Sequence, residues 1–233
     1  MTISPAAELS AAELAQMIDH TLLKQNSSRD DILRVCDEAR EFKFKSVCVN
    51  PLWVSTVSEA LEGSGVLTCS VIGFPFGASP TAVKVFETKQ AIADGANEID
   101  MVIDIASAIR GDRDALVADI SAIAAAAHEG NAILKVILET SMLDDAAKVL
   151  ACEASVEAKA DFVKTSTGFG GGGATVEDVA LMRKTVGPTL GVKASGGVRS
   201  REDALNMIKA GATRLGASSG IAIVRGELGE SSY

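Results

Sequence analysis

Short runs rich in valine and isoleucine recur eight times along this 233-residue chain, with helix-like stretches between them. Their centres are separated by roughly 22 to 35 residues, which is the room that a parallel strand, a crossover helix and two loops require. Eight such units favour a closed (β/α)8 TIM barrel, and an open doubly wound sheet is the structural alternative. We expect strands at residues 18–23, 46–50, 67–73, 98–105, 132–139, 162–167, 191–196 and 213–218.

Apolar residues at helical spacing fill the gaps between these runs. Ser200 with Asp203 and Thr175 with Asp178 are typical of helix N-caps, and Pro80 suits a first helical turn. The spacing predicts three buried helix faces: Ile32, Val35, Cys36 and Ala39; Val83, Phe86, Ala91 and Ile92; and Leu116, Ile120, Ile123 and Ala127.

A single domain is predicted for residues 1–233, because no proline- or serine-rich linker and no abrupt shift of composition interrupts the pattern. We expect the N-terminal segment, 1–17, to carry a helix at about 8 to 17 that precedes the first strand. The last residues, about 226–233, are expected to form a flexible C-terminal tail.

Charge and cysteine usage limit the partners of the chain. Lys and Arg total 22 and Asp and Glu total 31, a net charge of −9, so the surface should repel nucleic acid and anionic membranes. An anionic substrate would need a local basic pocket. The four cysteines have no disulfide-like or metal-like spacing, which indicates reduced thiols. With no signal peptide and no run of membrane-spanning length, we expect a soluble, cytoplasmic protein.

Two lysines occupy unusual positions, Lys164 in FVKTSTG and Lys193 in GVKASGG. Lysine is depleted from strands, yet Phe162 and Val163 precede the first and Val192 precedes the second. A solvated strand end is the simpler interpretation for one isolated lysine. Two near-identical placements predict instead that neighbouring strands aim two ammonium groups at one place.

An amine of this kind can act as a nucleophile. A lysine with the ordinary pKa of about 10.4 is almost entirely protonated at pH 7, and only the neutral form attacks a carbonyl. Favouring the neutral form by roughly 4 to 5 kcal/mol is within reach of burial plus one adjacent cation. We expect Lys193 to be that cation and Lys164 to be the nucleophile.

Alternation along the strand places Phe162, Lys164 and Ser166 on one side, which we expect to be the barrel interior. Asp100, an acid within an apolar run, is predicted to move protons or to pair with a buried lysine, and both can hold. In a parallel barrel such residues meet near the carboxyl ends of the strands. The residues expected to converge are Asp19, Thr21, Cys48, Asp100, Lys135, Lys164 and Lys193.

Glycine-rich loops follow the last three runs, at residues 168–173, 196–197 and 216–220. Their backbone amides could hold a phosphate, although glycine also serves tight turns without any ligand. GFGGGG matches a dinucleotide motif but lacks the acid about twenty residues later. GASSG matches a nucleophile elbow, yet no histidine follows it, so Ser218 and Ser219 are better interpreted as phosphate ligands. His20 and His128 stand alone, and we expect no metal and no cofactor.

The pattern as a whole resembles the deoxyribose-phosphate aldolases, which are class I aldolases built on a (β/α)8 barrel. The resemblance runs from about residue 18 to 220. It is carried by DHTLL, VCVNP, GFPFG, EIDMVI, LKVILET, DFVKTSTGF, KASGG and GASS, in this order. It implies reversible cleavage of 2-deoxy-D-ribose 5-phosphate into acetaldehyde and D-glyceraldehyde 3-phosphate.

The resemblance also implies roles for individual residues. Lys164 would form the Schiff base, Lys193 would perturb it, Asp100 would relay protons through water, and Tyr233 at the chain end would assist proton transfer. The hydroxyl- and water-binding part of the pocket would comprise Asp19, Thr21, Cys48 and Lys135. Further substrate contacts, mainly to phosphate, would come from Thr167, Gly168, Gly196, Gly197, Gly216, Ser218 and Ser219. GFGGGG departs from the family pattern, which has a polar Ser or Thr among these glycines.

Two other functions remain open. One is another Schiff-base aldolase or transaldolase that acts on a related sugar phosphate. The other is a barrel that binds a sugar phosphate without turning it over, which would need no perturbed lysine. The oligomeric state is also open, with a homodimer as one option.

Overall fold

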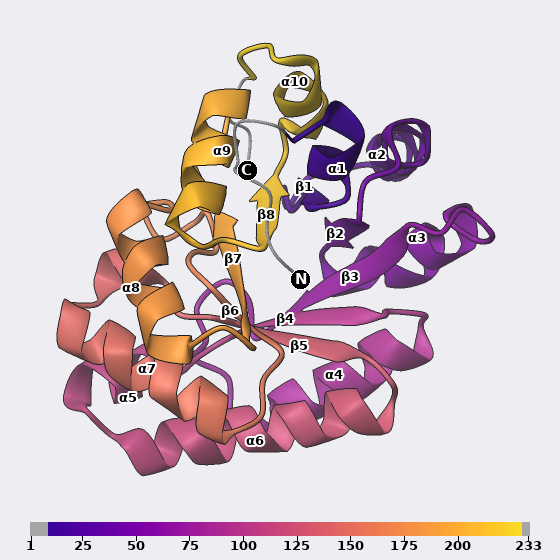
Figure 1. Ribbon diagram of the computed structural model, residues 1–233. Helices are drawn as coiled ribbons and strands as arrows, with labels where there is room; N and C mark the ends of the chain where they lie inside the picture. Colours follow the sequence, from indigo (N-terminus) through magenta and orange to yellow (C-terminus); the bar gives the residue numbers. More distant parts are fainter. Residues whose placement is uncertain (1–8, 230–233) are drawn as a thin grey trace.

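The computed structural model describes residues 9–229, which form a closed barrel of eight parallel strands (Figure 1). The strands pair in chain order, and the last pairs with the first. They are β1 (Ile18–Leu22), β2 (Ser46–Val49), β3 (Leu67–Ile72), β4 (Glu98–Val102), β5 (Ile133–Ile137), β6 (Phe162–Lys164), β7 (Gly191–Ser195) and β8 (Arg214–Ala217). All eight predicted strands are confirmed, and the sheet is closed rather than open. Most predicted runs extend past the strand into the loop that follows.

Helices surround the strands in chain order (Figure 1). They are α1 (Ala11–Ala15), α2 (Arg29–Phe42), α3 (Val54–Ala60), α4 (Thr81–Ala93), α5 (Ile105–Arg110), α6 (Arg113–Glu129), α7 (Asp145–Glu157), α8 (Val176–Val186), α9 (Arg201–Ala210) and α10 (Gly220–Arg225), with short 3-10 turns η2 (Pro51–Trp53) and η3 (Thr140–Met142). Among residues 9–229, no helix is long and apolar enough to cross a membrane.

The helix starts follow the predicted capping residues. Ser200 and Asp203 form a reciprocal capping box at α9, and Thr175 accepts a hydrogen bond from the Asp178 amide at α8. Pro80 is the N-cap of α4 rather than its first helical residue.

The leading helix is shorter than predicted. It ends at Ala15, because the chain then enters the barrel: the Met17 carbonyl accepts a 2.7 Å hydrogen bond from the Leu215 amide of β8. Residues 1–8 and 230–233, which include Tyr233, lie outside the described range. Within the predicted tail, the Gly229 amide donates to the Arg199 carbonyl at 2.9 Å. The single-domain boundary of 1–233 stays a prediction.

The predicted apolar faces of α2 and α6 are buried, but the face predicted for α4 is only half right: Ala91 is buried and Ile92 packs against the core, whereas the other two residues face outward. Val83 and Phe86 are 50% and 71% exposed. The buried stripe of α4 includes Lys84, whose ammonium group donates to Asp119 on α6 at 2.7 Å and to the Val102 carbonyl at 3.0 Å. This ion pair rotates the helix away from the orientation that its apolar residues suggest.

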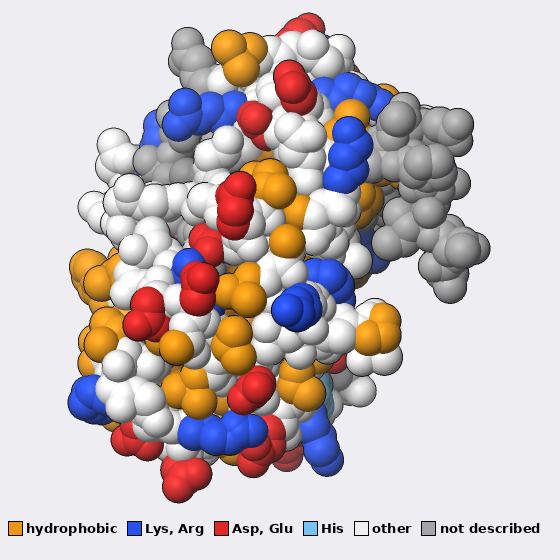
Figure 2. Space-filling model, turned by 60° about the vertical axis from the view of Figure 1, so that its left-hand side comes forward, with side chains coloured by type: hydrophobic (Ala, Val, Ile, Leu, Met, Phe, Trp, Pro, Cys, Tyr) orange, Lys and Arg blue, Asp and Glu red, His pale blue; other side chains and the backbone are white. Residues whose placement is uncertain are grey.

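The main apolar core lies between the strands and the helices, whereas the barrel interior is largely polar. In β4, for example, Ile99 and Met101 belong to the core, while Glu98 and Asp100 contact charged residues inside the barrel. This division follows from the two-residue repeat of a strand. On the outer face seen in Figure 2, acidic, basic and hydrophobic side chains are interspersed, so no single charge dominates this face.

Candidate active site

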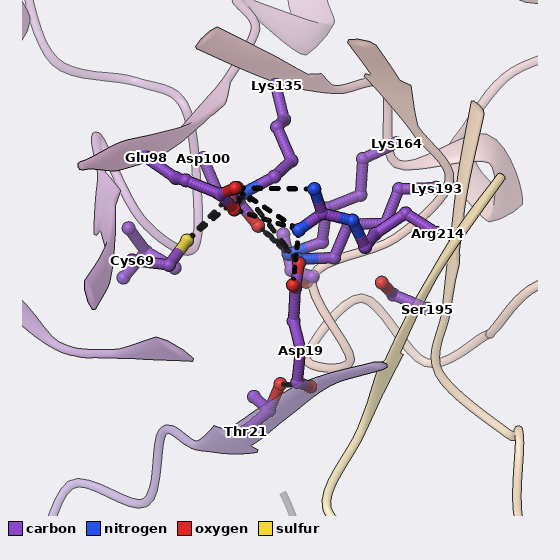
Figure 3. Close-up of polar contacts among 12 residues, drawn as sticks. Asp19, Thr21, Cys69, Glu98, Asp100, Lys135, Lys164, Lys193, Ser195 and Arg214 are labelled. Atoms are coloured by element: carbon purple, nitrogen blue, oxygen red, sulfur yellow. Dashed lines mark hydrogen bonds and ion pairs between the residues drawn. The ribbon is translucent and has the colours of Figure 1, made fainter. Parts of the chain in front are cut away.

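Lys164 and Lys193 meet at one carboxylate inside the barrel (Figure 3). The two Nζ atoms each lie 2.8 Å from the same oxygen, Oδ2 of Asp100. The lysines are direct neighbours in the register of β6 and β7, so their side chains leave adjacent strands on the same side of the sheet. Lys135, paired with Asp100 in the register of β4 and β5, contacts the other oxygen at 2.7 Å.

Three more charged side chains complete this interior network. Asp19 of β1 forms ion pairs with Lys193 at 2.5 Å and with Arg214 at 2.6 Å. Glu98 forms ion pairs with Lys135 at 2.7 Å and with Arg214 at 3.0 Å. When every group is ionised, four cations face three carboxylates, so the network has one surplus positive charge.

For most of these groups, ion pairing affects the pKa more strongly than burial does. Burial opposes ionisation of Asp100, but Lys135, Lys164 and Lys193 hold the pKa of this carboxyl well below its usual range. The pKa of Asp19 is lowered in the same way by its cationic neighbours. Burial likewise opposes the charge on Lys193 and Lys135, but the carboxylates around them raise the pKa of both amines.

Lys164 makes the fewest ion pairs of the three lysines in the network. Lys193 contacts two carboxylates and Lys135 contacts three, whereas Lys164 contacts only Asp100, at 2.8 Å. Loss of its proton would leave the network neutral and would break the fewest ion pairs. It is also the lysine nearest to solvent, with 3% of its side chain exposed against 0% for the other two.

Cys48 adjoins the network through a second cysteine. It pairs with Cys69 in the register of β2 and β3, and the Cys69 thiol donates to Asp100 at 3.3 Å. A hydrogen bond with Cys69 lowers the pKa of Cys48, and burial raises that of Cys69. Thr21 lies on the same strand as Asp19, β1, and its hydroxyl donates to the Asp19 backbone carbonyl at 2.8 Å.

The two thiols and the Asp100 carboxylate have the spacing of a possible metal site, since their ligand atoms lie within 4.8 Å of one another. Asp100, however, already contacts three lysine ammonium groups. These cations would repel a divalent metal ion, so the charges of the site do not fit one.

The glycine loops after β6 and β7 meet around a cavity of about 300 Å³. Its lining comprises Gly168, Gly171, Gly172, Gly173, Gly196, Gly197 and Arg199. Gly196 and Gly197 have φ angles of 82° and 80°, a region that favours glycine, and a Cβ on Gly196 would lie 2.9 Å from the Gly173 backbone. The loops can therefore approach each other only as glycines. The cavity combines backbone amides with one guanidinium group, a combination suited to an anion.

Thr167 is tied to a carboxylate that the sequence analysis passed over. Its hydroxyl donates to Glu139, at the end of β5, and its amide lies 3.3 Å from the same carboxylate. The Phe169 amide donates to the Thr167 hydroxyl at 2.9 Å. Glu139 thus fixes the start of the glycine loop.

A second cavity of about 530 Å³, with largely apolar walls that include Phe76, Ile105 and Phe169, adjoins this loop.

The last two predicted phosphate contacts, Ser218 and Ser219, are half-buried between β8 and α10. Gly216 does not lie in a loop as predicted. It belongs to β8, where an added Cβ would come within 3.0 Å of Lys193 Cε. Its missing side chain makes room for the lysine stem.

A family model described as DeoC/LacD family aldolase matches residues 13–228 of the sequence. The chain belongs to this family of aldolases. The deoxyribose-phosphate aldolase of Micrococcus luteus is 61% identical over 230 residues, which cover 96% of this chain and 99% of that protein. The deoxyribose-phosphate aldolase of Lysinibacillus sphaericus is 59% identical over 219 residues, which cover 94% and 98%.

Solved structures agree with this membership of the DeoC/LacD family. A deoxyribose phosphate aldolase from Aeropyrum pernix, described as having a unique tetrameric structure, matches with a TM-score of 0.88 and 35% identity. The match covers 93% of this chain and 91% of that chain. The barrel therefore has the fold of known aldolases.

Glu98, Arg214, Cys69, Glu139 and Arg199 are the residues near the site that the sequence analysis did not select. Two of them carried a usable signal: Glu98 stands two residues before Asp100 in the same strand, and Arg214 stands two residues before Gly216. A charged residue at that spacing faces the same side of its strand. Cys69, Glu139 and Arg199 had no such signal, because their positions depend on strand pairing and loop conformation.

Proposed function

We propose that this chain is a class I aldolase that reversibly cleaves 2-deoxy-D-ribose 5-phosphate into acetaldehyde and D-glyceraldehyde 3-phosphate. The observation that carries the proposal is the contact of Lys164 and Lys193 with one oxygen of Asp100. Identity of about 60% to deoxyribose-phosphate aldolases over nearly the whole chain supports the choice of substrate.

In the proposed reaction, the neutral amine of Lys164 attacks C1 of the open-chain aldehyde and forms a carbinolamine. Asp100, with water, delivers the proton that lets hydroxide leave as water, which gives the protonated imine. A base then removes the proton of the C3 hydroxyl, and the C2–C3 bond breaks. Glyceraldehyde 3-phosphate departs, and the bond electrons remain as an enamine on Lys164. Protonation at C2 and hydrolysis of the imine release acetaldehyde and restore the amine.

The proposal depends on the one surplus positive charge of the interior network. Lys193 keeps its proton because Asp19 and Asp100 both contact it. Its charge favours the neutral form of Lys164, while Asp100, together with water, moves protons to and from the reaction intermediates. We assign Lys135, with Asp19, to the positioning of Asp100 and of Lys193, and we assign Thr21 and Cys48 to the wall of the pocket.

We assign the substrate phosphate to the cavity of about 300 Å³ between the glycine loops. Gly168, Gly196 and Gly197 would donate backbone amides, and Arg199 would supply the positive charge that the acidic surface as a whole lacks. Ser218, Ser219 and Gly216 on the neighbouring strand remain proposed contacts. Thr167 would contact substrate from a position set by Glu139. The role of Tyr233, which lies outside the described residues, stays a prediction, as do the cytoplasmic location, the absence of a metal and the homodimer.

The proposal can be tested by trapping. Incubation with acetaldehyde and sodium borohydride should add 28 mass units, an ethyl group, to the peptide that contains Lys164. Lys164→Met should abolish the label and the cleavage of 2-deoxy-D-ribose 5-phosphate. A label on another lysine would contradict the assignment.

Lys84 provides a matched control. It is also fully buried and pairs with one carboxylate, at 2.7 Å, but it lies outside the barrel interior. Lys84→Met should lower stability and leave the label in place.

A panel of sugar phosphates separates this enzyme from a different Schiff-base aldolase or a transaldolase. Binding of the sugar phosphate without cleavage or label would indicate a non-catalytic barrel.

A further inference from the structure

Two buried serines repeat the arrangement of the two lysines. Ser166 follows Lys164 by two residues, and Ser195 follows Lys193 by two residues. Along an extended strand such as β7, this spacing keeps a side chain on the same side and moves it about 6 to 7 Å toward the carboxyl end. Ser166 lies just past the end of β6, where the Thr165 amide still donates to the Lys193 carbonyl at 3.0 Å. The serines therefore form the next layer of the barrel interior, above the lysines. Figure 3 shows the Ser195 hydroxyl beside the charged network and directed toward it.

Both hydroxyls lack a hydrogen-bond partner. Ser166 is 0% exposed and Ser195 is 3% exposed, yet neither Oγ contacts a donor or acceptor in the described part of the chain. A buried polar group without a partner costs roughly 1 to 3 kcal/mol. Two such groups in neighbouring positions are unusual in a folded protein, and they are expected where a ligand supplies the missing bonds.

The position of the serines identifies the part of the substrate that they would face. An added Cβ on Gly196, which lines the phosphate cavity, would lie 3.7 Å from Ser166 Cβ. An added Cβ on Gly216 would lie 2.4 Å from Ser195 Oγ and 3.0 Å from Lys193 Cε. Ser166 thus adjoins the loop that lines the phosphate cavity, and Ser195 adjoins the stem of Lys193, which is the neighbour of the amine that would hold C1.

We propose that Ser166 and Ser195 hydrogen-bond the C4 hydroxyl of the sugar phosphate and make the enzyme selective for it. This inference rests on the proposed function. C4 is the carbon next to the phosphate-bearing carbon, and its hydroxyl stays with the three-carbon product. A serine hydroxyl can donate and accept, so a pair of them satisfies a secondary alcohol, which also donates and accepts. The phosphate itself is matched by Arg199 and the glycine amides.

The test compares cleavage of 2-deoxy-D-ribose 5-phosphate with cleavage of its 4-deoxy analogue. Ser166→Ala and Ser195→Ala should each lower kcat/KM for the parent substrate by about fivefold and change that for the analogue by less than about twofold, since one hydrogen bond contributes roughly 1 kcal/mol. The analogue cannot close a five-membered ring, but this difference is the same for every variant and cancels in the ratio. Equal losses on both substrates, or no loss on the parent, would overturn the proposal.

Stability provides a second readout. Removal of an unpartnered hydroxyl should leave the midpoint of thermal unfolding unchanged or raise it, whereas a structural role would lower it. Ser155 is the matched control: it is fully buried, but its hydroxyl donates to the Ala151 carbonyl at 2.7 Å, far from the site. Ser155→Ala should leave both kcat/KM values unchanged. If an alanine variant fails to fold, the corresponding Ser→Cys variant keeps the volume and tests the same contact.

A wrong inference can be told apart from a wrong function. Acetaldehyde has no hydroxyl, so borohydride trapping on Lys164 should proceed in both serine variants at the wild-type rate. If wild-type protein neither traps acetaldehyde nor cleaves the parent sugar, the proposed function fails. If it does both and the serine variants retain full selectivity for the C4 hydroxyl, only the present inference fails.

Discussion

Replacement of Lys193 by methionine tests the charge argument directly. The Nζ atoms of Lys193 and Lys164 are less than about 6 Å apart, because both lie 2.8 Å from Asp100 Oδ2. At an effective dielectric constant of about 20, two unit charges at this distance repel each other by roughly 3 kcal/mol. Without Lys193, three cations balance three carboxylates, and Lys164 has no reason to lose its proton. The neutral fraction of Lys164 should fall about a hundredfold.

The assay is the rate of Schiff-base trapping with acetaldehyde and borohydride between pH 6 and 10. Lys193→Met should be about a hundredfold slower than wild type at pH 7 and should recover about tenfold per pH unit as the medium becomes alkaline, because base then supplies the neutral amine. Lys193→Arg, which keeps the positive charge, should retain more activity at pH 7. A loss that does not depend on pH would show that Lys193 acts only through structure, and an unchanged rate at pH 7 would refute the charge argument.

Two further results follow from the interior network and the glycine cavity. The pKa of Asp100 is lowered and that of Lys193 is raised in the folded state, so the free energy of unfolding should be highest between about pH 4 and pH 10. It should fall at lower pH, where the unfolded carboxylate takes up a proton, and at higher pH, where the unfolded lysine releases one; denaturant titrations from pH 3 to 11 measure this. Asp100→Asn should flatten the acid limb and lower kcat at least a hundredfold. Arg199→Ala should raise KM for the phosphorylated substrate at least tenfold and leave acetaldehyde trapping unchanged, whereas slower trapping would place Arg199 in the chemistry.

The strands could be predicted because their outer faces are apolar over the whole sheet. Each run of valine and isoleucine packs against helices, and this requirement is local to the run. The face of α4 could not be predicted in this way. Its buried stripe depends on Lys84, and a lysine becomes a buried residue only when a partner such as Asp119, 35 residues later in the chain, receives it. Spacing within one helix contains no information about that partner.

The same distinction applies to the site. Lys164, Lys193 and Asp100 could be selected because each is a charged residue within an apolar strand. The sequence does not reveal that Asp100 lies between the two amines, because this geometry depends on the closure of the barrel. Nor does it reveal the full charge balance, since Glu98 and Arg214 also contribute to it, and the sequence analysis did not select either residue. Inspection of every second residue in the eight strands would have found both.

Each strand packs one face into the apolar core and turns the other toward the charged interior, and this division lets the protein tolerate buried charge. Among residues 9–229, seven acidic and basic side chains form the network of the barrel interior, and burial of unpaired charges would cost far more than a domain of this size can supply. They are tolerated because each carboxylate contacts two or three cations, and because the apolar core forms independently on the other face of the same strands. One cation remains in excess, and the fold places it on Lys164, where the pairing is weakest and solvent is nearest. If Lys164 is the reactive amine, as we propose, its reactivity depends on the charge balance of the whole network rather than on one neighbouring lysine.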